Sequence, residues 1–103
     1  MTRSTHSAHW GFTSLTVHGD RLRGVEYGAI HAPLHTSVQY GYGSSAELVG
    51  VFQGSVGGFN YARQGTPTVA ALESLVNRME GGVGSLCFAS GMGAITAVFT
   101  TLL

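Results

Sequence analysis

The sequence of 103 residues contains no lysine, and its five basic side chains other than histidine are all arginines. A lysine amine is the side chain that forms Schiff bases with carbonyl compounds, so no side chain here can do so. Charged residues make up only 10% of the sequence, whereas about a quarter is usual in a soluble domain. This low charge predicts a chain whose surface is largely covered by partners or by further protein. The formal net charge of zero argues against nucleic acid or an anionic membrane as the partner.

Cysteine is almost absent as well. The single Cys87 excludes an internal disulfide framework and fits a reducing compartment, so we expect a cytoplasmic protein. Because it lies in the apolar run Leu86–Ala89, we expect a buried, inert thiol. The first eleven residues have no apolar segment typical of a secretory signal. They include His6 and His9, which lack a nearby cysteine or carboxylate partner and predict no metal site.

The clearest element in the sequence is a helix from Pro67 to Glu80. Thr66 is a good N-cap, and Pro67 fits the first helical position, where its missing N–H costs nothing. Apolar residues then recur at helical spacing, and Gly81 and Gly82 end the helix. The apolar residues are Val69, Leu72, Val76 and Met79, with Leu75 on the flank. The polar residues off this stripe, expected to face water, are Glu73, Asn77 and Glu80.

A strand, a glycine turn and a second helix are predicted near the end of the sequence. The run Leu86–Ala89 predicts a buried strand, and helical spacing of apolar residues begins at Met92. A helix that starts at such a turn leaves free backbone N–H groups that can bind an anion such as phosphate. Gly91 and Gly93 would let a ligand approach the backbone closely. Taken alone, the turn favours an ordinary strand-to-helix connection in an α/β domain over a phosphate site.

The first half of the sequence is loop-rich and shows no sustained period. Ser45 is expected to cap a short helix, and the remainder predicts a binding arm rather than a core. At the other end, residues 95–103 are apolar or β-branched on most sides, with no glycine, proline or charge to stop the helix. We therefore expect a helix that is cut, with the strands that pair with Leu86–Ala89 lying beyond Leu103.

Tyr61 and Arg63 lie just before the predicted helix Pro67–Glu80. A guanidinium group binds phosphate through two parallel hydrogen bonds, so Arg63 is a candidate anion clamp. If the segment is extended, Tyr61 points to the same side and reaches the same ligand. The alternatives are a surface salt bridge for Arg63 and a packed aromatic ring for Tyr61.

Several motifs occur in a fixed order along the sequence. They are Thr16-Val17-His18-Gly19-Asp20, Pro33-Leu34-His35-Thr36-Ser37-Val38, Tyr61-Ala62-Arg63, Thr66-Pro67-Thr68, Leu72-Glu73, Glu80-Gly81-Gly82 and Ser90-Gly91-Met92-Gly93-Ala94-Ile95. Together they resemble the Cys/Met-metabolism family of pyridoxal-phosphate enzymes, which includes cystathionine γ-synthase, cystathionine lyases, methionine γ-lyase and O-acetylhomoserine sulfhydrylase. The resemblance runs from about Leu15 to Leu103.

The resemblance implies an α/β enzyme of fold type I, similar to aspartate aminotransferase, that binds pyridoxal phosphate and is usually a tetramer of close dimers. Residues 1–60 would form the N-terminal arm for subunit contacts, and residues 61–103 the truncated start of the large cofactor-binding domain. By similarity, Gly91 and Met92 donate backbone N–H groups to the cofactor phosphate. Tyr61 and Arg63 would reach into the neighbouring subunit and bind the same phosphate.

The sequence departs from the family pattern at three points. Thr66 replaces the usual asparagine and Gly93 the usual alanine, and the Schiff-base lysine is missing. We therefore expect an inactive N-terminal part of an enzyme that replaces the γ-substituent of an activated homoserine, a small amino-acid substrate. The alternatives are a lyase acting on cystathionine or methionine, and a non-catalytic remnant that serves as an oligomerisation module.

Overall fold

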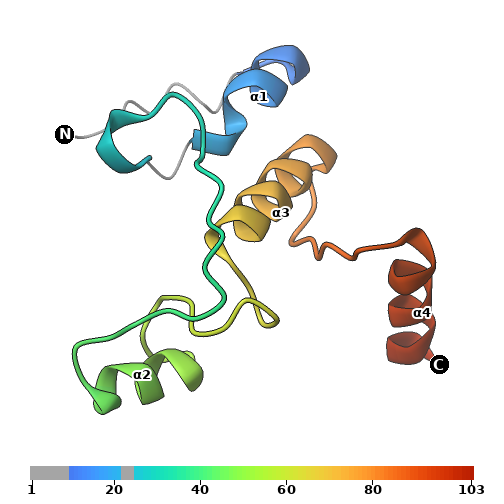
Figure 1. The fold of residues 1–103 in the computed structure, drawn as a ribbon. Helices are drawn as coiled ribbons and strands as arrows, with labels where there is room; N and C mark the ends of the chain where they lie inside the picture. Colours follow the sequence, from blue (N-terminus) through green and yellow to red (C-terminus); the bar gives the residue numbers. More distant parts are fainter. Residues whose placement is uncertain (1–9, 22–24) are drawn as a thin grey trace.

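The computed structural model describes residues 10–21 and 25–103. Within these residues the chain forms helices joined by long loops (Figure 1). The α-helices are α1 (Phe12–His18), α2 (Ser45–Phe52), α3 (Pro67–Glu80) and α4 (Gly91–Leu102), and the short 3-10 helices are η2 (Gly19–Arg21) and η3 (Glu26–Gly28).

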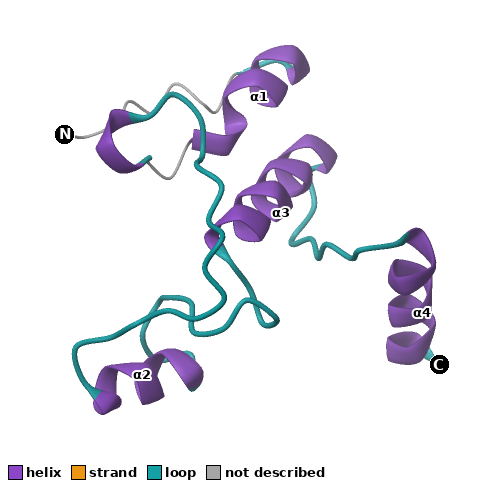
Figure 2. Ribbon diagram, viewed as in Figure 1, coloured by secondary structure: helices purple, strands orange, loops and turns teal. Residues whose placement is uncertain are grey.

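No β-strand occurs in the described part of the chain, as Figure 2 shows. Its one β-type pairing is an antiparallel bridge between Gln39 and Tyr61. The predicted strand at Leu86–Ala89 is therefore wrong for this structure, because residues 84–88 have neither helical nor strand hydrogen bonding. A strand exists only by pairing its backbone with a neighbour, and an apolar run alone does not supply one.

The best-packed region is formed by α1, η2 and α3, which contact one another pairwise. Gly19 makes the close approach possible, because a Cβ atom on it would lie 2.7 Å from Cδ1 of Leu75 and 3.1 Å from Cδ1 of Leu15. Helix α1, in the half of the chain that showed no sustained period, therefore packs on α3.

Helix α3 has the predicted bounds and caps. The Thr66 hydroxyl accepts the Val69 N–H at 3.1 Å, and Gly81 ends the helix in the left-handed region at φ 64°. The side of α3 that faces α1 carries Leu75, whereas the predicted apolar stripe is only partly covered. Its exposed fractions are 37% for Val69, 51% for Leu72 and 38% for Val76.

Glu73 does not simply face water, contrary to the prediction. It is half-buried, its carboxylate accepts the Cys87 N–H at 2.9 Å, and its backbone carbonyl accepts the Ser85 hydroxyl. These bonds hold the linker between α3 and α4 against α3. The Cys87 thiol is exposed, so the expectation of a buried thiol is wrong here, because the linker lies on the surface.

Helix α2 begins one residue earlier than predicted. Ser44, not Ser45, is the N-cap, and its hydroxyl accepts the Glu47 N–H at 3.2 Å. Gly50 lies inside this helix, and the chain after the helix folds back against it. Glycine leaves room for this approach, because a Cβ on Gly50 would lie 2.8 Å from Cγ2 of Val56. Val51, 9% exposed, is the most buried large apolar side chain of the described residues.

The chain is open in shape. Its radius of gyration is 15.9 Å, whereas a compact domain of this length has one of about 13 Å. Figure 1 shows α2 and α4 lying apart from the α1–α3 group. No helix within residues 10–21 and 25–103 is long and apolar enough to cross a membrane.

Candidate functional site

The N-terminus of α4 presents two unpaired backbone donors. Ser90 is the N-cap, with an extended backbone (φ −146°, ψ 153°), and its hydroxyl accepts the Gly93 N–H at 3.0 Å. The Ser90 carbonyl accepts the Ala94 N–H at 3.2 Å. Of the first four N–H groups of α4, those of Gly91 and Met92 therefore have no acceptor among the described residues. These are the two residues to which the family resemblance assigned the role of phosphate donors.

The two glycines of this turn have different roles. A Cβ on Gly91 would meet no atom within 4 Å, so the space beside its backbone is open to a ligand. A Cβ on Gly93 would lie 3.1 Å from the Ser90 hydroxyl oxygen. Gly93 thus leaves room for the cap, and the open approach to the backbone is at Gly91.

The N-terminus of α4 can bind a phosphate group. α4 has 12 residues, and the aligned peptide dipoles place a partial positive charge at the end where the free donors lie. Met92 is 69% exposed, so the second donor also belongs to a residue at the surface. The residues present therefore fit a phosphate dianion, although a full neutralisation of its charge requires a cation.

Arg63 and Tyr61 supply a cation and a hydroxyl in the loop before α3. The carbonyl of Tyr61 accepts the N–H groups of Gln64 at 3.0 Å and Gly65 at 3.3 Å, so this segment is a turn. The extended backbone on which the sequence argument relied is absent. The Arg63 side chain nevertheless lies over the Tyr61 ring. Its guanidinium carbon is 5.3 Å from the ring centroid, within cation–π range.

The Tyr61–Arg63 turn and the N-terminus of α4 are not brought together within one chain. The turn lies before α3, and α4 lies after the linker that follows α3. The 14 residues of α3 alone span roughly 21 Å. Figure 1 shows the loop before α3 and the start of α4 in separate parts of the molecule. One copy of the chain therefore carries the free donors of α4 and the arginine at two separate places.

A segment that the sequence did not reveal supports the turn. The Ala62 N–H donates to the Val38 carbonyl at 2.8 Å, and the Tyr40 N–H donates to the Asn60 carbonyl at 3.2 Å. The rings of Tyr40 and Phe59 lie 6.0 Å apart beside this pairing. A signal was present, because Val38 and Tyr40 are of β-favouring types, as are Phe59 and Tyr61 on the opposite segment. The predicted His6 and His9 lie outside the described residues.

The comparisons with known proteins decide the family. The model described as "Cys/Met metabolism PLP-dependent enzyme" matches residues 13–103. The chain belongs to this family. Its cofactor is accordingly pyridoxal phosphate.

Relatives of this family member include synthases and lyases. The chain is 38% identical over 104 residues to cystathionine γ-synthase 1, chloroplastic, from Arabidopsis thaliana, covering 99% of the chain and 18% of that protein. It is 34% identical to L-methionine γ-lyase from Pseudomonas deceptionensis, covering 97% of the chain and 23% of that protein. The solved structure of metB from Corynebacterium glutamicum matches 93% of the chain and 23% of its own length, with a TM-score of 0.78 and 30% identity. The chain thus spans about a fifth of the length of these relatives.

Proposed function

We propose that this chain is the phosphate-binding and subunit-contact part of a fold-type I, pyridoxal-phosphate-dependent enzyme of sulfur amino-acid metabolism. Residues 1–60 would form the arm and residues 61–103 the start of the large domain. The observation that carries the proposal is the N-terminus of α4, where Ser90 leaves the N–H groups of Gly91 and Met92 free beside open space.

The protein residues would act on the cofactor's phosphate, not on its reactive ring. The N–H groups of Gly91 and Met92 would hold the phosphate, and the dipole of α4 would favour its negative charge. The Arg63 guanidinium would add charge-assisted hydrogen bonds, and the Tyr61 hydroxyl would add a further donor. When bound, pyridoxal phosphate supplies the electron sink that stabilises carbanions. The lysine that anchors the aldehyde must come from outside these residues, since the chain has none.

Tyr61 and Arg63 would serve the site of a neighbouring subunit. Their separation from α4 in one chain, their exposure and the low charge of the sequence support this arrangement. An exchange of this kind requires at least a two-fold dimer, in which each subunit gives the pair and receives it. We therefore propose a homo-oligomer built of close dimers, in the cytoplasm.

The reaction we favour is replacement of the γ-substituent of an activated homoserine. The identity to the Arabidopsis cystathionine γ-synthase, 38%, is higher than the 34% to the Pseudomonas methionine γ-lyase. A lyase is the second candidate. The enzyme that contains this chain, supplied with an O-acylhomoserine and cysteine, should form cystathionine. Release of an α-keto acid and ammonia from methionine or cystathionine as the faster reaction would instead establish the lyase.

The phosphate-binding proposal can be tested in a chimaera, in which this chain replaces the matching segment of the C. glutamicum metB protein. Arg63→Gln should weaken the binding of pyridoxal phosphate roughly 10- to 100-fold, the effect of losing charged hydrogen bonds. Binding of pyridoxal, which lacks the phosphate, should be unchanged. Arg78→Gln is the matched control, because Arg78 lies at the exposed end of α3. Equal affinity of wild type and Arg63→Gln for pyridoxal phosphate would refute the proposal.

A further inference from the structure

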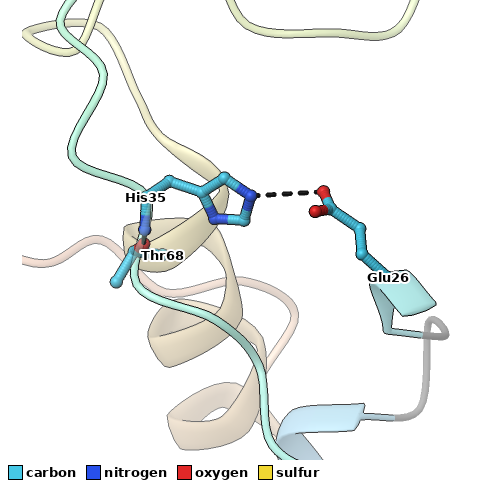
Figure 3. A network of polar contacts seen from close by, with 3 residues as sticks. All are labelled: Glu26, His35 and Thr68. Carbon is cyan, nitrogen blue, oxygen red and sulfur yellow. Dashed lines mark hydrogen bonds and ion pairs between the residues drawn. The ribbon is translucent and has the colours of Figure 1, made fainter. Parts of the chain in front are cut away.

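The segment from His35 to Tyr40, here called the brace, joins two parts of the molecule. At its first residue, the His35 N–H donates to the Thr68 hydroxyl oxygen at 2.8 Å. Figure 3 shows this contact, with the His35 ring extending away from Thr68 to Glu26, where Nε2 lies 3.3 Å from the carboxylate. The first end of the brace is thus fixed to the first turn of α3 and to η3.

The other end of the brace is hydrogen-bonded to the turn that carries Tyr61 and Arg63. The Val38 carbonyl accepts the Ala62 N–H at 2.8 Å, and the Tyr40 N–H donates to the Asn60 carbonyl at 3.2 Å. These bonds lie on either side of the bridge between Gln39 and Tyr61. Ala62, the residue between the two phosphate-binding side chains, is therefore paired directly with the brace.

The bonds close a ring of backbone. The chain runs from Ala62 through the turn to Thr68, crosses to His35, and returns through Val38 to Ala62. The Thr68 side of the ring is rigid, because α3 is capped by Thr66 and packs on α1 and η2. The Tyr61–Arg63 side is a surface turn. A ring with one rigid side limits the positions of the other side, and the Thr68 hydroxyl is the contact that closes it.

We infer that Thr68 is a positioning residue for the cofactor phosphate: its hydroxyl fixes the brace, and the brace fixes the turn from which Tyr61 and Arg63 reach the phosphate. The inference rests on the proposed function of Arg63. Thr68 itself does not touch the phosphate. Its loss should change where the arginine is presented and leave the donors of α4 intact.

The test uses Thr68→Val in the chimaera, since valine keeps the shape and removes the acceptor. We expect roughly 3- to 10-fold weaker binding of pyridoxal phosphate, as for loss of one neutral hydrogen bond, and unchanged binding of pyridoxal. Thr68→Ser should restore the affinity. Amide exchange of Ala62 and Tyr40 should be faster in Thr68→Val than in wild type. Thr16→Val is the matched control, because the exposed Thr16 hydroxyl bonds only to the Phe12 carbonyl of its own helix.

A second pair of variants separates positioning from general support. In an Arg63→Gln background, Thr68→Val should cause no further loss of pyridoxal-phosphate affinity, because the residue acts through Arg63. Additive losses, or an equal loss of affinity for pyridoxal, would overturn the inference. If Thr68→Val does not fold, Thr68→Ala serves in its place. If Arg63→Gln alone has no effect, the proposed function fails; if only Thr68→Val has none, the inference about Thr68 fails.

Discussion

The carboxylate of Glu73 accepts the backbone N–H of Cys87, 14 residues further along the chain, at 2.9 Å. This contact holds the linker against α3 shortly before the N-cap of α4. A glutamate that the helical pattern assigned to solvent therefore helps to position the start of α4. The Ser85 hydroxyl, two residues before Cys87, donates a second hydrogen bond to the backbone carbonyl of Glu73.

Removal of this acceptor should loosen the linker. In the chimaera, Glu73→Ala should lower the free energy of unfolding by about 1 kcal/mol, since the Cys87 N–H loses a charged acceptor in a half-exposed place. Glu73→Gln, which keeps an acceptor oxygen, should lose less. Denaturant unfolding measures the difference, and Glu80→Ala, on the exposed face of the same helix, is the control. An equal loss for Glu73→Ala and Glu80→Ala would contradict the role given to Glu73.

Deletion of one donor at the anion site is possible without damage to the helix. Gly91 is the first residue of α4, a position that proline favours, and Ser90 before it has the extended backbone that proline requires. Gly91→Pro should bind pyridoxal phosphate about 10-fold more weakly in the chimaera, by loss of one charged hydrogen bond. Gly91→Ala keeps the N–H but places a methyl group in the open space proposed for the phosphate, so it should weaken binding less than Gly91→Pro. Titration followed by cofactor absorbance distinguishes the two.

The cap of α4 should contribute to both stability and binding. Ser90→Ala should destabilise the chimaera by about 1 kcal/mol, the usual cost of losing an N-cap. It also frees the Gly93 N–H, which disorders the turn that presents Gly91 and Met92. Ser90→Thr keeps an acceptor and should retain most of the stability. Thermal unfolding with and without pyridoxal phosphate measures both effects, and a fully stable Ser90→Ala would exclude the cap as a determinant of the site.

Exchange of Tyr61 and Arg63 between subunits predicts complementation. Arg63→Gln and Gly91→Pro chimaeras are each defective in every site when pure. Mixed dimers would contain one site with both defects and one intact site, so random mixing should restore about a quarter of the wild-type sites. Cofactor retention after co-refolding is the measurement. If both residues served the same subunit's site, mixing would restore nothing.

The free 103-residue chain should not fold cooperatively. Val51 is the one large apolar side chain of the described residues that is exposed by less than a tenth, and such burial cannot offset the conformational entropy of a chain of this length. Denaturant titration should give a broad transition, and the chain should bind a hydrophobic dye. A sharp transition of a compact monomer would favour the non-catalytic module instead.

Local signals in the sequence identified the helices well. Thr66, Pro67 and Gly81 gave both ends of α3, because capping depends only on residues next to the helix. They also predicted free N–H donors at the start of α4, since the start of a helix is likewise a local property, whereas the resemblance singled out Gly91 and Met92. The resemblance, not the chemistry of single residues, supplied Tyr61 and Arg63 as their partners.

Long-range features were beyond these signals. The run Leu86–Ala89 has the composition of a strand, but strand formation depends on a partner that no local pattern reveals. The bond from His35 to Thr68 joins residues 33 positions apart and uses a backbone N–H, which every residue except proline has. The prediction that Glu73 faces water was wrong for a similar reason. The helical period gives the face of the helix on which a residue lies, but not which later part of the chain packs against that face.

The partly exposed apolar stripe of α3 has a consequence for biosynthesis. As Val69, Leu72 and Val76 leave the ribosome, the described chain offers a surface that covers them only in part. A nascent chain in this condition is a substrate for holding chaperones and is prone to self-association until a covering surface is made. The yield of soluble protein should therefore depend more on chaperone supply and on the speed of translation than on the stability of α3 itself.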